Sequence, residues 1–147
     1  MLTSIWFFVN IQNNIIAINE RGLIYMKENV EREIQITLLQ MGVPTNLLGF
    51  LYLIYALQLT LENFEYITRL SKFLYVDVAE KYHTEPCCVE KCIRHAIDVT
   101  FSNKLNNYAS AVFDNIDHPT NTQFISRMYF HLISEKGIPL QEKRLSR

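Results

Sequence analysis

Glycine and proline are scarce in this chain, with four of each among 147 residues. Leucine, isoleucine and aromatic residues are plentiful instead. This composition argues against a disordered chain and favours a packed α-helical protein. The length fits one domain by the usual size prior and is enough to bury a sizeable core.

The chain also lacks an excess of charge of either sign. Its formal net charge is −1 at pH 7. Proteins that bind DNA are usually more basic, so the global charge gives no support to that class of function. Any attraction to phosphate must then come from local clustering of Lys and Arg.

Cysteine is limited to three residues in one short stretch, Cys87, Cys88 and Cys92. Neighbours along the chain are poor disulfide partners, and a pair on one helix is strained, so we expect a reducing cytoplasm. Cys88, Cys92 and His95 suggest a zinc or redox site as one alternative. No paired CxxC motif is present, and Cys92 fits an apolar stripe as a small hydrophobe. We therefore predict no metal and no cofactor.

No secretory signal and no membrane-spanning run is visible. The apolar start has no early Lys or Arg, and polar residues at 10 and 12–14 interrupt it. The uninterrupted run is far below the ~20 residues needed to span a bilayer, so no membrane partner is expected. Two β-rich runs, 5–11 and 15–18, allow a short β-hairpin in an N-terminal extension of residues 1–30.

The signatures of common enzymes are missing as well. There is no Gly-rich phosphate loop, no nucleophile elbow and no HExxH motif. Asp114 and Asp117 beside His118 suggest acid–base chemistry, but such residues more often cap and turn a loop. We predict no catalytic residues and no enzymatic activity.

From residue 27 onward, apolar residues recur at helical spacing. We predict an all-α bundle of about six to seven helices that contains a helix–turn–helix. The second helix is apolar nearly all round and is therefore expected at the centre. Phe64, Ile67, Leu70 and Leu74 are expected to face inward. The helices are expected over residues 27–41, 47–61, 63–74, 77–82, 84–101, 108–116 and 121–136.

Residues at the ends of these segments suggest where the helices start and stop. Gly42 and Gly137 are expected to end the first and the last helix. The expected caps are Thr45 or Asn46 for the second helix, Thr84 for the helix at 84–101, and Thr120 or Asn121 for the last.

Residues 75–99 predict the helix–turn–helix itself. Ala79 supplies a small residue at the helix crossing, and His83 falls where the turn often needs a positive φ. The second helix has an inward stripe of Val89, Cys92, Ile93, Ala96 and Ile97. Its opposite face carries Cys87, Glu90, Lys91, Arg94 and Asp98, with Cys88 and His95 at the flank.

The chemistry of that face suits the DNA major groove. Arg and Lys donate to guanine O6 and N7, and Glu accepts from cytosine N4. An ordinary solvated helix face with mixed charges has the same pattern, however. Spacing alone leaves both interpretations open.

Four segments carry a resemblance to a known family. VEKCIRHAID at 89–98, LYVDVAEKY at 74–82, MGVPTNLLGFLYLIYAL at 41–57 and PTNTQFI at 119–125 resemble the C-terminal DNA-binding domain of the stage zero sporulation protein A family of response regulators. The resemblance covers about residues 31–135. It implies an all-α effector domain at 31–137, followed by a basic tail at 138–147.

The resemblance implies a sequence-specific transcription regulator of sporulation. Its partner would be double-stranded DNA with a TGTCGAA-like box, bound as a head-to-tail homodimer. The segment at 98–103 resembles the one through which the family contacts the sigma subunit of RNA polymerase. The family also carries a receiver domain, which the 30 residues upstream cannot hold. The chain is then either a fragment or a stand-alone paralogue.

By this resemblance, the base-reading positions are Glu90, Lys91 and Arg94. The candidates for contact with the DNA backbone are Lys81, Thr84, Cys87, Cys88 and His95, together with the basic tail. The family usually has Arg at Lys91, and Lys keeps the charge but loses the planar fork. Cys87 and Cys88 replace a usual Ser and Arg, which should weaken contact with the backbone.

A second hypothesis comes from a different class of function. The domain would keep the fold but not bind DNA, and would act as an interaction module or antagonist of a full-length regulator. The near-zero charge, the loss of Arg at Cys88 and the apolar N-terminus motivate it.

Overall fold

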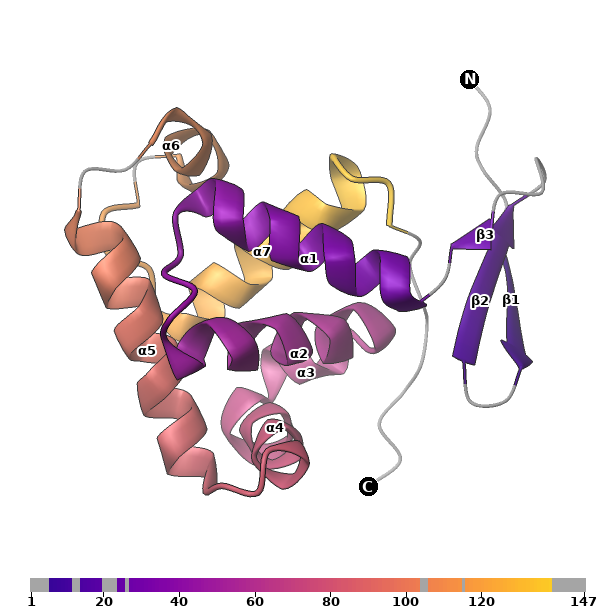
Figure 1. The fold of residues 1–147 in the computed structure, drawn as a ribbon, viewed down its shortest axis with the longest axis horizontal. Helices are drawn as coiled ribbons and strands as arrows, with labels where there is room; N and C mark the ends of the chain where they lie inside the picture. Colours follow the sequence, from indigo (N-terminus) through magenta and orange to yellow (C-terminus); the bar gives the residue numbers. More distant parts are fainter. Residues whose placement is uncertain are drawn as a thin grey trace.

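The computed structural model describes residues 6–11, 14–19, 24–25, 27–103, 106–114 and 116–138, with side chains described from residue 29 onward. In these residues, seven α-helices and one π-helical turn form a bundle (Figure 1). The predicted all-α bundle is therefore confirmed. The helices are α1 Lys27–Met41, α2 Leu48–Glu62, α3 Glu65–Thr68, the π-helical turn η1 Leu70–Leu74, α4 Tyr75–Lys81, α5 Pro86–Ser102, α6 Asn107–Phe113 and α7 Asn121–Ser134.

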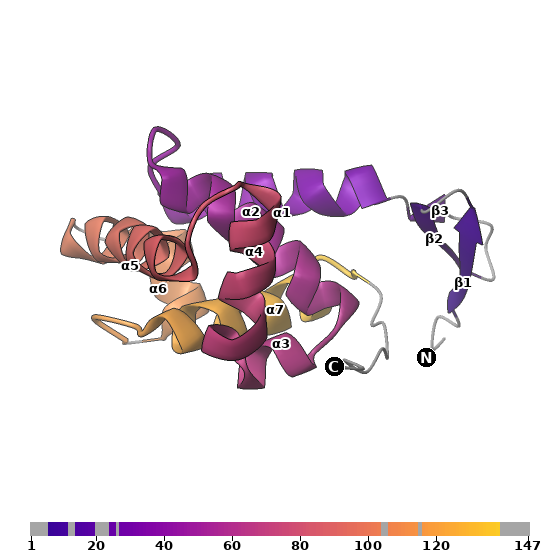
Figure 2. The same cartoon turned by 90° about the horizontal axis from the view of Figure 1, so that it is seen from below.

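Three short strands precede the bundle. β1 (Trp6–Ile11) pairs antiparallel with β2 (Asn14–Asn19), as in the expected hairpin, and β3 (Ile24–Tyr25) adds a third strand on the other side of β2. The sheet lies beside the N-terminal end of α1 (Figures 1 and 2). The boundary at residue 30 between an extension and a DNA-binding domain stays a prediction.

The core forms around α2, as its nearly continuous apolar sequence predicts. This helix packs against α1, α4, α5 and α7. Leu53 and Leu57 on α2 are fully buried, while Leu48 and Leu51 remain exposed on its outer side. Side chains from every neighbouring helix close the core, among them Ile34, Leu38, Leu74, Val78, Val89, Ile93, Phe124, Ile125 and Met128.

Glycine ends the first helix and stands shortly after the last one. Gly42 follows α1 with φ +85°, and Gly137 lies three residues after α7 with φ +67°. These left-handed positions suit glycine because it has no Cβ. Both predicted stops are confirmed.

The cap of α2 differs from the prediction. Leu47, in extended backbone, is the N-cap, and no side chain forms a capping hydrogen bond there. Thr45 and Asn46 lie in a turn that follows Pro44, and the backbone becomes helical only at Leu48. Neither residue therefore caps the helix, and that prediction is wrong.

The helix expected over residues 63–74 is broken in two. Arg69 leaves the helical region with φ −136° and ψ 46°, between α3 and η1. The wider π-helical turn changes the angular spacing of side chains, and Leu70, Phe73 and Leu74 are all buried along it. Phe64, which precedes α3, is 44% exposed rather than inward, so this part of the prediction is wrong too.

The last two helices have side-chain caps. At the start of α6, the Asn106 side-chain oxygen accepts from the Ala109 amide (2.7 Å). The Nδ2 group of the same side chain donates to the backbone carbonyl of Gln40 in α1 (2.8 Å). Thr120 caps α7 in a capping box with Gln123, as predicted for Thr120. Of the basic tail predicted at 138–147, Ile138 is buried in the core, and residues 139–147 lie outside the described residues. No described helix has the length and apolarity that a membrane crossing needs.

Candidate nucleic-acid interface

The turn between α4 and α5 is closed by two backbone hydrogen bonds. The amide of Thr84 donates to the carbonyl of Ala79 (3.0 Å), and the amide of His83 donates to the carbonyl of Glu80 (3.4 Å). This pair defines a Schellman motif, which needs a left-handed residue after the first helix. His83 takes that place with φ +53°, which confirms the positive φ predicted there.

The helix α5 begins later than predicted. Pro86 is its first residue, a position at which the missing N–H of proline costs little. A residue before proline is pushed toward extended backbone, and Glu85 is extended and occupies the N-cap. The prediction that Thr84 caps this helix is therefore wrong. Its amide instead helps to close the turn.

The inward stripe of α5 is placed as predicted. Val89, Ile93 and Ala96 are fully buried, and Cys92 is half-buried beside them. Burial raises the pKa of the Cys92 thiol, and Cys88 one turn earlier adds a smaller effect in the same direction. The stripe fixes which side of α5 faces solvent.

The opposite face brings the predicted base-reading residues together. Lys91, Arg94, Cys87, Asp98, Cys88 and His95 are exposed, and Glu90 is half-buried. Glu90 and Arg94 form an ion pair one turn apart along the helix. Their side chains are 38% and 56% exposed, so water screens the pair and its opening costs about 0–1 kcal/mol. The guanidinium is therefore free to exchange Glu90 for another acceptor.

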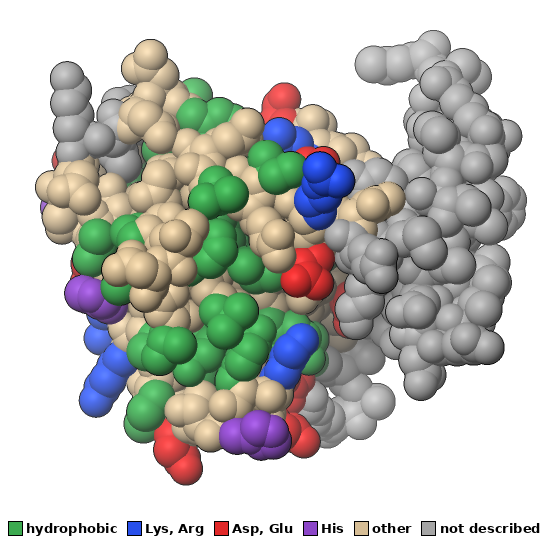
Figure 3. Space-filling model, viewed as in Figure 1, with side chains coloured by type: hydrophobic (Ala, Val, Ile, Leu, Met, Phe, Trp, Pro, Cys, Tyr) green, Lys and Arg blue, Asp and Glu red, His purple; other side chains and the backbone are tan. Residues whose placement is uncertain are grey.

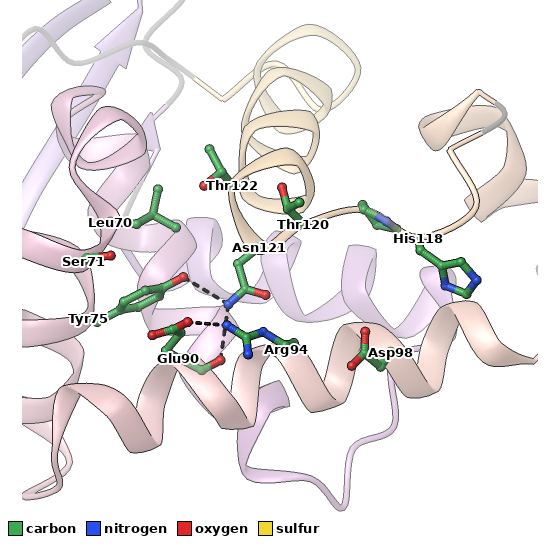
Figure 4. Close-up of a pocket in the computed structure, with 11 residues that line it drawn as sticks. Leu70, Ser71, Tyr75, Glu90, Arg94, Asp98, His118, Thr120, Asn121 and Thr122 are labelled. Carbon is green, nitrogen blue, oxygen red and sulfur yellow. Dashed lines mark hydrogen bonds and ion pairs between the residues drawn. The ribbon is translucent and has the colours of Figure 1, made fainter.

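A shallow hollow lies between this face and the start of α7. Figure 4 shows Glu90, Arg94 and Asp98 of α5 on one side of it, with His118 and the first residues of α7 opposite. The remaining lining residues come from η1, α4, the loop before α7 and the first turn of α7: Leu70, Ser71, Tyr75, Pro119, Thr120, Asn121 and Thr122.

Lys81 occupies the end of α4, away from that hollow. Its Nζ stands 4.0 Å from the centre of the Tyr55 ring, close enough for a cation–π interaction. The side chain is exposed, as contact with a phosphate requires, and Thr84, three residues on, is half-buried.

The charges of the interface are mixed. Lys91, Arg94 and His95 share α5 with Glu90 and Asp98, and Glu85 stands at its N-cap. On the face seen in Figure 3, Lys and Arg side chains are dispersed among hydrophobic and polar ones rather than gathered in one patch. Attraction to phosphate therefore rests on a few individual cations.

The cysteines form no disulfide. Within the part of the chain that the structure describes, no three His, Cys, Asp or Glu side chains are arranged to hold a metal ion. Asp114 takes a left-handed conformation (φ +38°) that ends α6, which is the capping role weighed above against acid–base chemistry.

Sequence reasoning missed two residues that hold α5 in place. Asn121 was considered only as a cap for α7, yet its side chain bonds to both α4 and α5. Gly49 was not singled out, although a Cβ on it would lie 2.6 Å from the Ala96 Cβ. The one available signal was their presence inside two of the segments that carry the family resemblance.

Residues 34–132 match the model of a known protein family, described as "Sporulation initiation factor Spo0A C terminal". The matched range includes α4, α5 and the start of α7, and covers most of the chain.

Proposed function

The chain belongs to the Spo0A C-terminal family of DNA-binding effector domains of the sporulation regulator, and we propose that α5 is the helix that reads DNA in the major groove. The observation that carries the proposal is the solvent-facing side of α5, with Glu90, Lys91 and Arg94 turned away from the inward stripe, in which all residues except Cys92 are buried. The α4–turn–α5 unit then acts as a helix–turn–helix.

The proposed target is a TGTCGAA-like box. Arg94 donates to guanine O6 and N7, and Glu90 accepts from cytosine N4. Glu90 and Arg94 lie one turn apart along α5, which suits the neighbouring C and G of such a box. Lys91 adds a point charge without the planar fork of arginine.

Contacts with the DNA backbone would fix the register of the domain. The proposed residues are Lys81, Thr84, Cys87, Cys88 and His95, all near the turn or along the flank of α5. Cys87 and Cys88 contribute no charge, so we expect modest affinity with a shallow dependence on salt. Head-to-tail pairing on DNA and contact of residues 98–103 with the polymerase sigma subunit are further parts of this proposal.

Arg94→Ala tests the proposal most directly. A labelled duplex that contains the box competes with an unlabelled duplex in which the box is shuffled. Loss of one bidentate contact worth about 1–3 kcal/mol should reduce the preference for the box by about 5- to 150-fold. Arg32→Ala, which removes an exposed arginine from α1, should keep the preference. Equal preference for the box in Arg94→Ala and wild type would contradict the assignment of Arg94 as a base-reading residue.

The interaction-module hypothesis makes the opposite forecast. The observation in its favour is the near-zero net charge combined with the dispersed cations on the face seen in Figure 3. Under that hypothesis the wild-type domain shows no preference for the box and captures a full-length regulator in a pull-down. If the wild-type domain prefers the box, the result favours sequence-specific DNA binding over the interaction-module hypothesis.

A further inference from the structure

One amide side chain ties three helices together beside the proposed recognition face. The Nδ2 group of Asn121, the first residue of α7, donates to the Tyr75 hydroxyl of α4 (3.0 Å) and to the backbone carbonyl of Glu90 in α5 (3.2 Å) (Figure 4). These residues come from three of the segments that the resemblance singled out. The role of the segment at 119–125 is otherwise unassigned.

The Glu90 carbonyl does not need the hydrogen bond from Asn121 to have a partner. Glu90 lies inside α5, where its carbonyl faces the amide of Arg94 one turn later, as in any α-helix. The bond from Asn121 is therefore additional. It holds the same helical turn that carries the Glu90 and Arg94 side chains.

Asn121 is itself rigidly placed. The Thr120 hydroxyl accepts from the Gln123 amide, and the Gln123 side chain accepts from the Thr120 amide, which completes a capping box. Phe124 and Ile125 in the next turn are fully buried. Tyr75, the other acceptor, is 5% exposed. The amide thus connects α5 to two elements that the core holds firmly.

We propose that Asn121 is a positioning residue for sequence recognition, whose two hydrogen bonds set the orientation of α5 against α4 and α7. This inference rests on the proposed function, because it assumes that α5 reads bases. It assigns to Asn121 an effect on discrimination between DNA sequences rather than on binding to DNA in general.

The distinction follows from the geometry of the two kinds of contact. Bidentate bonds to base edges weaken steeply when angle and distance are wrong. Contacts of flexible side chains with phosphates tolerate a small shift and carry no sequence information. A loosened α5 should therefore lose preference for the box while it keeps its non-specific affinity.

The test compares three variants of the full chain by their ratio of dissociation constants for shuffled and box duplexes at one salt concentration. Asn121→Ala removes both hydrogen bonds and should lower the ratio about tenfold, with unchanged affinity for the shuffled duplex. Tyr75→Phe removes one bond and should lower the ratio less. Ser134→Ala, the control, removes a hydrogen bond within the last turn of α7, far from Asn121, and should keep the wild-type ratio.

A second measurement separates this inference from the proposed function. Amide hydrogen exchange at residues 90–94 should speed up in Asn121→Ala but not in Ser134→Ala, whether or not DNA is bound. If the wild type does not prefer the box, the proposed function is wrong, and exchange alone decides whether Asn121 holds α5. An unchanged ratio or unchanged exchange in Asn121→Ala, or an equal loss in Ser134→Ala, would overturn the positioning role.

Discussion

At Gly49, the helices α2 and α5 approach more closely than any side chain would permit. A Cβ there would meet the backbone carbonyl of Cys92 and lie 2.6 Å from the Ala96 Cβ. The absence of a side chain thus sets how deeply the buried stripe of α5 packs onto α2.

Gly49→Ala should therefore destabilise the domain. Insertion of one methyl group into a packed contact costs about 1–3 kcal/mol, to be measured as a lower urea midpoint in equilibrium unfolding. Adding Ala96→Gly removes the contact with the Ala96 side chain but not the one with the Cys92 carbonyl. We expect only partial recovery in the double variant, and full recovery would contradict a backbone clash.

The Lys81 ammonium lies over the face of Tyr55 in the free domain, and in the proposed complex a DNA phosphate would compete with that ring for it. Lys81→Ala should weaken binding to all duplexes by a similar factor and reduce the slope of log affinity against log salt by about 1. Lys136→Ala, two residues beyond the end of α7, is the control. If Lys81→Ala alters the choice of sequence, Lys81 is not a phosphate contact.

At the scale of elements, α6 and α7 meet at one titratable pair. The Tyr108 hydroxyl lies 2.6 Å from Nε2 of His131. Burial lowers the pKa of His131, with a smaller lowering by Lys136 and an opposing effect of Glu135. The folded state therefore favours the neutral ring more strongly than the unfolded chain does.

This shift predicts how stability responds to acid. A histidine with a depressed pKa binds fewer protons when folded, so its contribution to stability is present above the unfolded pKa of about 6.5 and is lost as pH falls below it. Unfolding midpoints measured from pH 7.5 to 5 should show this loss. His131→Gln should flatten the decline relative to wild type, with His118→Gln measured in parallel. If the unfolding midpoint of His131→Gln falls with pH as steeply as that of the wild type, the Tyr108–His131 pair is not the source of the pH dependence.

The scale of elements also shows where sequence patterns were enough. Long helices with a regular apolar stripe, such as α1 and α5, were predicted within a few residues, because burial of one stripe decides both the helix and its orientation. The stretch at 63–74 was not. The break at Arg69 precedes a π-helical turn in which Leu70, Phe73 and Leu74 are all buried. The periodicity of apolar residues does not indicate such a break.

For the whole molecule, the arrangement of the core bears on where a stable domain begins. Among the side chains that the structure describes, the buried apolar residues run from Ile34 to Ile138. Residues 27–138 should therefore unfold cooperatively at a melting temperature within a few degrees of that of the full chain, by calorimetry. A large loss of stability would show that the N-terminal strands or the tail contribute to the fold, and would move the predicted boundary at residue 30.

The sequence by itself determined the all-α class, the two helices joined by a turn within residues 75–99, the positive φ at His83 and the family, because these depend on local patterns and on residue identity along the chain. It also placed Glu90, Lys91 and Arg94 on one exposed face. Only the tertiary structure decided what holds that face in position: the close approach at Gly49 and the hydrogen bonds of Asn121. Both join residues distant in sequence, and such contacts follow from how helices pack rather than from any pattern within one helix.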